Sequence, residues 1–300
     1  MSTTDFTILT ADGQNLPVSV FPAEGAADAP VIQILHGMAE HAGRYQAFAA
    51  QLQRAGYTVW LHNHRGHADR LPAGHLARGE WALLLDDIAR IQDTLPDGRR
   101  LILFGHSMGS FIARDFLCSY PQRADALILS GTGSAGALRL RAGRAMVAAV
   151  AALSGADKPS RFLSVLGFGS FNKRIADART PADWLSRDPA AVQAYLSDPL
   201  CGRDCTPSFW YELTSALIRI HSKQAYRALP PSLPVYLFSG AEDPVGNYGK
   251  GVRQVRDALL EGGVRDVQMR LYGGGRHEML QETNTEEVVR DLLEWLQRHA

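Results

Sequence analysis

The sequence predicts an α/β fold, in which helices cover both faces of a doubly wound, mostly parallel sheet. Compact apolar runs have the length and composition of buried strands, and stretches with apolar residues at helical spacing separate them. These runs are 31–35, 57–61, 101–104, 126–132 and 233–240. Regular alternation of strand and helix implies right-handed crossovers between parallel strands.

The first twenty residues predict an antiparallel hairpin. Apolar residues alternate with polar ones over 6–10 and again over 16–20, and an Asp12-Gly13 turn separates the two segments. Two alternating segments joined by such a turn are typical of a hairpin, which we place at the start of the sheet. Pro17 has no amide hydrogen to donate, so it suits an edge strand better than a central one.

Helical segments complete the alternation and have recognisable ends. They are expected over 45–52, 81–95, 111–120, 252–259 and 289–296. Gly56 ends the first helix and Pro96 ends the second. A last strand, with apolar residues on one side, is expected over 267–271.

The alternation breaks at about residue 133 and returns near residue 233. The interval 134–230 is helix-rich and irregular, whereas 1–133 and 231–300 together contain the strands of the sheet. We therefore expect a core made of 1–133 and 231–300, with 134–230 inserted as a helical cap. Such a cap would lie over the carboxyl ends of the strands, where ligands bind in folds of this kind.

Composition excludes several classes of protein. The chain has 300 residues, of which 46% are hydrophobic, and its 31 Lys and Arg balance its 31 Asp and Glu, so no nucleic-acid partner is expected. The N-terminus has no signal-peptide pattern and no apolar run reaches the ~20 residues of a membrane span, which predicts a cytoplasmic protein. Cys118, Cys201 and Cys205 are too few for a disulfide framework, and no cofactor is expected.

The chemical centre of the chain is predicted at Gly105-His106-Ser107-Met108-Gly109. This G-x-S-x-G motif follows an apolar strand and precedes a helix, which is the context of a nucleophile elbow. The tight turn would present the Ser107 hydroxyl at the end of the strand, next to helix N-terminal amides.

A serine nucleophile needs a base, a carboxylate that orients the base, and donors for the oxyanion. The order of Ser, acid and His expected for this elbow points to Asp243, after the strand ending at Gly240, and to His277, before the last helix. Glu242 is the substitute acid. The oxyanion donors are expected to be the backbone amides of Met108 and of Met38, in the loop after the first parallel strand.

A rival pattern lies in His62-Asn63-His64-Arg65-Gly66-His67. Its H-x-H-x-x-H spacing is similar to that of binuclear metallohydrolases, but Gly66 occupies the place of the expected acid. We therefore expect no metal site and interpret the segment as a structured loop beside the active site.

These motifs together resemble the α/β-hydrolases, in the branch of monoacylglycerol lipases, lysophospholipases and serine aminopeptidases. The resemblance rests on 36–41, 43–45, 64–67, 105–109, 240–245 and 276–278. It implies Ser107 as nucleophile, His277 as base and Asp243 as acid, with the Met38 and Met108 amides as oxyanion donors. The chain departs from the family pattern in one loop, where Asn63, Ala68 and Arg70 replace Asp, Gly and Ser.

The resemblance implies a serine hydrolase that cleaves carboxylic esters through an acyl-enzyme, most similar to monoacylglycerol lipases or lysophospholipases. A serine aminopeptidase or amidase with the same triad is the alternative, and a binding module without activity is a third hypothesis. The substrate would be a small-molecule or lipid ester, and the sequence leaves the oligomeric state open.

The cap carries the expectations about substrate. Residues 138–153 are basic at the start and apolar afterwards, so they could contact a membrane surface or form a helix packed on the core. The candidates for lining an acyl pocket are Phe162, Leu166, Phe168, Phe209 and Trp210.

Overall fold

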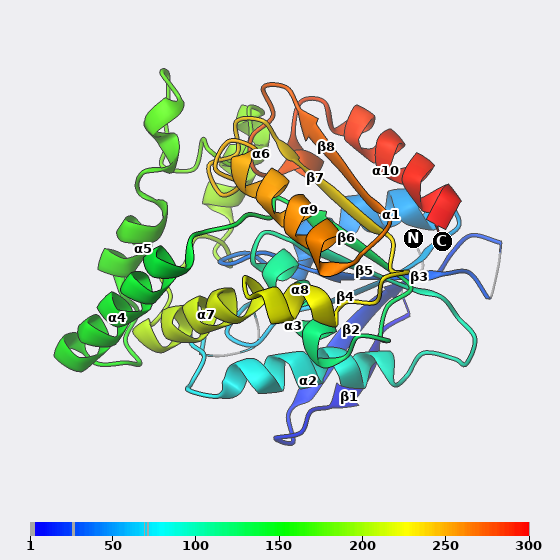
Figure 1. Cartoon of the computed structure of the whole chain (residues 1–300), viewed down its shortest axis with the longest axis horizontal. Helices are drawn as coiled ribbons and strands as arrows, with labels where there is room; N and C mark the ends of the chain where they lie inside the picture. The colour runs from blue at the N-terminus through cyan, green and yellow to red at the C-terminus, as the bar shows by residue number, and fades with distance from the viewer. Residues whose placement is uncertain (1–3, 26–27, 69, 71, 300) are drawn as a thin grey trace.

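The computed structural model describes residues 4–25, 28–68, 70 and 72–299, and these residues form an eight-stranded sheet with helices on both faces (Figure 1). The strands are β1 (Phe6–Leu9), β2 (Asn15–Phe21), β3 (Val31–Leu35), β4 (Thr58–His62), β5 (Leu101–His106), β6 (Ala126–Ser130), β7 (Val235–Gly240) and β8 (Val267–Tyr272). Their order in the sheet is β1-β2-β4-β3-β5-β6-β7-β8. Strands β3 to β8 run parallel, which confirms the doubly wound α/β class.

Helices fill the intervals between the strands. They are α1 (Gln46–Arg54), α2 (Glu80–Gln92), α3 (Met108–Ser119), α4 (Ala137–Ser154), α5 (Arg161–Phe168), α6 (Pro189–Ser197), α7 (Pro207–Ile220), α8 (Lys223–Ala228), α9 (Lys250–Gly262) and α10 (Thr285–His299), with short 3-10 turns η1 (Ala42–Tyr45), η2 (Phe171–Arg174) and η3 (Met279–Gln281). Residues 1–3, 26–27, 69, 71 and 300, which belong to the predicted core intervals, lie outside the described part of the chain.

The predicted N-terminal hairpin is confirmed, and Pro17 has an unexpected place in it. Strand β1 pairs antiparallel with β2, and β2 pairs antiparallel with β4, so β1 is the edge strand and β2 is internal. Pro17 nevertheless fits β2, because the pairing with β4 begins only at Val18. The missing amide hydrogen of Pro17 therefore costs no bond to β4.

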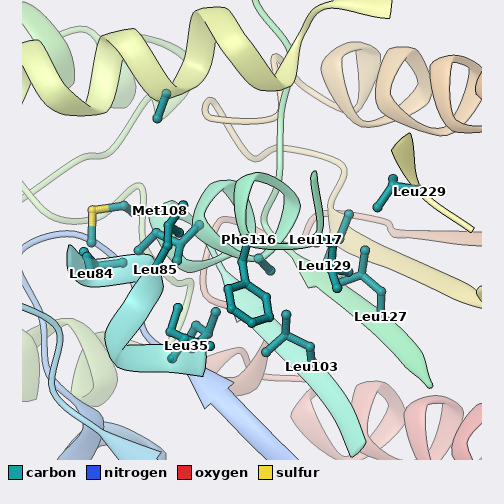
Figure 2. Close-up of a cluster of buried hydrophobic side chains, with 14 of the residues drawn as sticks. Leu35, Leu84, Leu85, Leu103, Met108, Phe116, Leu117, Leu127, Leu129 and Leu229 are labelled. Carbon is teal, nitrogen blue, oxygen red and sulfur yellow. The ribbon is translucent and has the colours of Figure 1, made fainter. Parts of the chain in front are cut away.

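Strands β3 to β7 are buried on both faces, which explains why they are continuous apolar runs. Alternate residues face opposite sides: Leu103 and Leu129 pack against α3, whereas Ile102 and Ile128 pack on the side of α1 and α10. Figure 2 shows Phe116 of α3 facing Leu103 of β5. Burial of such large side chains supplies most of the free energy that holds helix to sheet.

The insertion between β6 and β7 has two parts with different packing. Phe209, Leu213 and Tyr226 of α7 and α8 belong to the same buried cluster as Phe116 of α3. By contrast, α4 and α5 project beyond the sheet (Figure 1), and α4 packs against α7. The division into a core and a cap at 134–230 stays a prediction, and the later helices of that interval are packed into the core layer.

Candidate active site

Ser107 lies on a strained turn between β5 and α3. Its φ is 52° and its ψ is −119°, a backbone conformation that residues with a side chain rarely adopt. Two glycines make this turn sterically possible: a Cβ on Gly105 would lie 2.3 Å from the carbonyl oxygen of Gly109, and a Cβ on Gly109 would lie 2.0 Å from that of Leu35. The turn leaves Ser107 at the carboxyl edge of the parallel sheet, where β3, β7 and β8 also end.

Asp243 and His277 form a buried pair at the same edge. His277 Nδ1 lies 3.0 Å from Asp243 Oδ2, and both residues are almost completely buried. Asp243 is itself held by the Ser239 hydroxyl and the Val245 amide, which donate to its two oxygens at 2.8 Å. Because the Asp243 carboxylate accepts a hydrogen bond from His277 Nδ1, the neutral imidazole carries its hydrogen on Nδ1. His277 Nε2 is then free to accept a proton.

The surroundings of His277 make it a stronger base. Burial alone would lower its pKa, but attraction to the Asp243 carboxylate and the hydrogen bond to it raise the pKa above the ordinary 6.5. Glu242, the substitute acid, is exposed, so it is Asp243 that the structure brings against the imidazole.

A cavity of about 410 Å³ connects these residues. Ser107, His277 and Met38 all line it, and so does the cap. Its apolar wall comes mainly from α5, α6 and the segment before α6, through Val165, Phe168, Ala182, Trp184, Leu185 and Leu196. Ser107, His277 and Met38, which come from distant parts of the sequence, therefore lie around one cavity.

Two backbone amides near Ser107 are available as donors. In the loop after β3, the Gly37 amide donates to Glu40 Oε1 at 2.5 Å and the Ala39 amide donates to His67 Nε2 at 3.2 Å. Within the described residues, the amide between them, that of Met38, donates to no protein acceptor, and neither does that of Met108 at the start of α3. Unpaired amides at a helix start and in a tight loop favour binding of negative charge.

Trp184 is a neighbour of His277 that sequence reasoning did not identify. Its ring centroid lies 5.1 Å from that of His277, and its carbonyl oxygen accepts a hydrogen bond from the His277 amide at 3.3 Å. The guanidinium of Arg276 donates to the carbonyl oxygens of Asp183 and Ser186, which ties the same segment to the histidine loop. The only signal in the sequence is a tryptophan within the interval 134–230, which is expected to lie over the carboxyl ends of the strands.

Of the three histidines that suggested a metallohydrolase, only His67 binds backbone groups through its ring, and His64 makes its contact through its backbone amide. His36 Nε2 accepts from the His64 amide at 3.0 Å, and His67 Nε2 accepts from the Ala39 amide. Burial lowers the pKa of His62 to about 3 and of His67 to about 4, so these rings are neutral near pH 7. Through the His67 ring and the His64 amide, the segment supports the loop that carries Met38, whereas the Arg65 side chain binds Asp12 and Asp87 away from that loop.

A different group, His41, Asp198 and Cys201, has ligand atoms within 4.8 Å of one another. His41 Nδ1 accepts from the Gly43 amide, so its hydrogen is on Nε2, which donates to Asp198 Oδ2 at 2.8 Å. Burial raises the pKa of the Cys201 thiol to about 12. The group is therefore best described as a hydrogen bond between the loop after β3 and the end of α6.

The predicted acyl-pocket residues are only partly correct. Phe168 lines the cavity, and Trp210 packs on Phe168 at a centroid distance of 5.5 Å. Phe162 and Leu166 are instead 60% and 52% exposed on the outer face of α5, and Phe209 is fully buried in the core next to His67. The composition of the helices does not determine which face of each helix lines the cavity.

The strand order, the strained serine turn and the Asp–His pair at the carboxyl edge are those of an α/β hydrolase. Residues 26–284 match the family model described as serine aminopeptidase, S33. The chain belongs to this family, in its monoacylglycerol lipase-like branch.

Relatives and solved structures agree with this assignment. The chain is 30% identical to a monoacylglycerol lipase of Mycolicibacterium smegmatis, over 90% of this chain and 88% of the relative. It is 26% identical to the mouse monoglyceride lipase, over 96% of this chain and 89% of the relative. A thermostable carboxyl esterase from Bacillus coagulans, solved with glycerol, superposes with a TM-score of 0.88 at 25% identity and covers 100% of this chain and 99% of its own.

Proposed function

We propose that this protein hydrolyses carboxylic esters of monoacylglycerol or lysophospholipid type through an acyl-enzyme formed on Ser107. The observation that carries the proposal is His277, which is paired with the buried Asp243 and lines the same cavity as Ser107. The relatives support an ester hydrolase of the lipase type and give less support to an aminopeptidase.

The first half of the reaction forms the acyl-enzyme. The Ser107 hydroxyl attacks the ester carbonyl carbon while His277 Nε2 takes its proton, and Asp243 stabilises the resulting imidazolium. The oxyanion of the tetrahedral intermediate accepts from the Met38 and Met108 amides. As the intermediate collapses, the bond to the leaving oxygen breaks, and that oxygen takes the proton from His277 and departs as an alcohol.

The second half returns the free enzyme. Water attacks the acyl carbon and gives a proton to His277 Nε2, which produces a second tetrahedral intermediate on the same two amides. Collapse breaks the bond to Ser107 Oγ, and His277 returns the proton to it. The apolar cavity wall suits a fatty acyl chain.

The aminopeptidase alternative requires a carboxylate that binds the α-ammonium of the substrate. Glu40 and Glu278 line the cavity, but Arg44 binds both carboxylates, so neither is free for this role. Asp204 is a further carboxylate of the cavity wall. Two results together would replace our proposal by an aminopeptidase. The wild type would cleave aminoacyl amides as fast as esters, and Asp204→Asn would abolish the cleavage of those amides.

We also propose that α4 and α5 make peripheral contact with lipid surfaces. Leu140 and Val147 of α4 are buried, but Leu138, Leu153 and Phe162 are 82%, 89% and 60% exposed. One face of α4 thus packs on the protein while apolar side chains remain on the outside of both helices, next to the arginines of α4. Within the described residues, no helix combines the length and apolarity that a transmembrane span requires.

The decisive experiment compares Ser107→Ala with Ser119→Ala, a serine at the other end of α3. Ester hydrolysis would be measured on monoacylglycerol, lysophosphatidylcholine and simple esters of graded acyl length, and labelling with a fluorophosphonate. We expect Ser107→Ala to lose at least about 10³-fold in kcat together with all labelling, and Ser119→Ala to keep both. Wild-type turnover by Ser107→Ala would refute the proposal.

A further inference from the structure

We propose that Arg44 is a positioning residue that sets the oxyanion loop at a fixed place relative to His277. Its NH1 atom donates to Glu40 Oε2 and to Glu278 Oε1, both at 2.6 Å, and its NH2 atom donates to Glu278 Oε2 at 2.7 Å. One guanidinium thereby joins two carboxylates that belong to two different loops of the site. This inference rests on the proposed function, because it assigns Arg44 to the same reaction.

The first carboxylate holds the loop that carries Met38. Glu40 folds back so that Oε1 accepts from the Gly37 amide at 2.5 Å and from the Tyr45 hydroxyl at 2.8 Å. The fit is close, since a Cβ on Gly37 would lie 2.6 Å from Glu40 Oε1 and 3.3 Å from Ser107 Cβ. A fixed Gly37 amide fixes the direction of the following peptide group, whose amide is the unpaired donor of Met38.

Arg44 also keeps Glu40 ionised in this place. Burial alone would raise the pKa of the Glu40 carboxyl, but the charge of Arg44 dominates the effects that lower it to about 2. A neutral Glu40 would carry a hydroxyl hydrogen and could not accept equally well from Gly37, Tyr45 and Arg44 at once.

The second carboxylate holds the loop that carries His277. Glu278 follows His277 directly, its side chain is bound by both terminal nitrogens of Arg44, and its amide donates to the Leu185 carbonyl at 2.7 Å. A carboxylate bound at two points on a planar guanidinium has little rotational freedom. The backbone on the C-terminal side of the imidazole is therefore tied to Arg44.

The cap meets the same arginine. The guanidinium carbon of Arg44 lies 5.0 Å from the centre of the Tyr195 ring in α6, and the Tyr195 hydroxyl donates to the Ala39 carbonyl at 3.1 Å. Arg44 is thus the point at which the oxyanion loop, the histidine loop and the cap come together.

The bridge that Arg44 forms between Glu40 and Glu278 also affects the electrostatics of His277. Two carboxylates and one guanidinium leave a net charge of −1, and both Glu278 and Glu40 contribute to the raised pKa of His277. Loss of Arg44 would remove a positive charge from the surroundings of the imidazole and leave the Glu278 carboxylate without its partner, so the pKa of His277 would rise further. An arginine that stabilised the fold without contacting Glu40 or Glu278 would not change this pKa.

Arg65 offers a matched control, because it bridges two carboxylates in the same manner elsewhere in the core. Its guanidinium donates to both oxygens of Asp12 and both oxygens of Asp87, at 2.8 Å each. These partners belong to the N-terminal hairpin turn and to α2, and neither lines the cavity of Ser107 among the described residues.

The experiment compares Arg44→Met and Arg44→Lys with Arg65→Met, in full-length enzyme, by ester kinetics against pH and by thermal unfolding. For Arg44→Met we expect kcat to fall by about 10²-fold while KM changes by less than about threefold, since misplaced donors weaken transition-state binding. The acidic limb of kcat/KM should move to higher pH. Arg44→Lys should recover part of kcat, and Arg65→Met should lower Tm with an unchanged kcat and pH profile.

Chemical rescue provides a second test that does not depend on comparing the stabilities of the variants. The side chain of Arg44 borders a small cavity with Glu40, Tyr45, His106 and Glu278. Millimolar guanidinium or methylguanidinium should raise kcat of Arg44→Ala, and should leave Arg65→Ala and wild type unchanged. If the Arg44→Met protein does not fold, Arg44→Lys and this rescue still test the inference.

Two failures are distinguishable. Suppose that Ser107→Ala inactivates the enzyme. If a folded Arg44→Met or Arg44→Lys protein then kept the wild-type kcat and the wild-type acidic limb, only the role of Arg44 would be overturned. Retained turnover in Ser107→Ala would overturn the proposed function itself, and the role of Arg44 with it.

Discussion

The core wall of the cavity and the outer helices α4 and α5 are built in opposite ways. On the core side, Asp243 is fully buried and both of its oxygens have partners, and His277 is fixed through its ring, its backbone and its neighbour Glu278. On the side of α4 and α5, large apolar residues such as Leu138 and Phe162 face solvent. Buried, fully bonded groups define the reaction geometry, whereas the exposed helices can vary without disturbing it.

The largest expected effect comes from the core side. Asp243→Asn should lower kcat by about 10⁴-fold, because an amide at this position favours the wrong imidazole tautomer and does not stabilise the imidazolium. Steady-state kinetics would measure it, with Asp257→Asn on the exposed face of α9 as the unaffected control. More than a tenth of wild-type kcat in Asp243→Asn would show that another carboxylate orients His277.

A pair of glycines in helices tests the same contrast on stability. A Cβ on Gly109 in α3 would lie 2.0 Å from the Leu35 carbonyl oxygen, whereas a Cβ on Gly143 in α4 would meet no atom within 4 Å. Gly109→Ala should therefore destabilise the fold by at least about 3 kcal/mol or prevent folding, since backbone must move in a packed interior. Gly143→Ala should stabilise it by up to about 1 kcal/mol through helix propensity.

Urea unfolding measures both changes. Equal losses of stability in the two variants would mean that α4 is packed as closely as α3. The contrast between the core and the outer helices would then disappear.

The pH dependence of the wild-type enzyme should report the environment of His277. The base must be neutral to accept the Ser107 proton, and its pKa is raised above 6.5. Activity is therefore full above that raised pKa and is lost as the pH falls through it, about tenfold per pH unit well below it. A kcat/KM profile with its acidic midpoint below pH 6.5 would contradict the raised pKa.

The smallest effect is expected from the cap wall. Phe168→Ala removes a ring that lines the cavity and lies 6.0 Å from the stacked ring of Trp184. We expect KM for long-chain esters to rise by up to about tenfold, because acyl burial is lost, while short-chain esters keep their kinetics. Leu260→Ala, on the exposed face of α9, is the control, and an equal effect in both variants would place the acyl chain elsewhere.

Much of the molecule was predictable because local patterns determine it. The apolar runs of β3 to β7 and the elbow at Ser107 depend on neighbouring residues, and the order along the chain was enough to choose Asp243 and His277 as a pair. The position of Pro17 was not predictable in detail, because it depends on where the pairing of β2 with β4 begins.

Contacts between distant segments are the part that sequence could not supply. Phe209 is a core residue and Phe162 an exposed one, although both were expected in the acyl pocket, because the orientation of a helix depends on what packs against it. The bridge from Glu40 through Arg44 to Glu278 spans 238 positions of sequence, and no periodicity connects its two ends.

The bonds between the segment before α6 and the histidine loop also decide where this protein can be recombined with its relatives. Ser186 Oγ donates to the Gln281 carbonyl at 2.7 Å and Arg187 pairs with Glu282 at 2.9 Å, in addition to the contacts of Trp184 and Leu185. A chimaera that exchanged all of 134–230 would separate these partners. One that exchanged only α4 and α5 would transfer the exposed helices, together with Val165 and Phe168 of the cavity wall, and would keep these bonds.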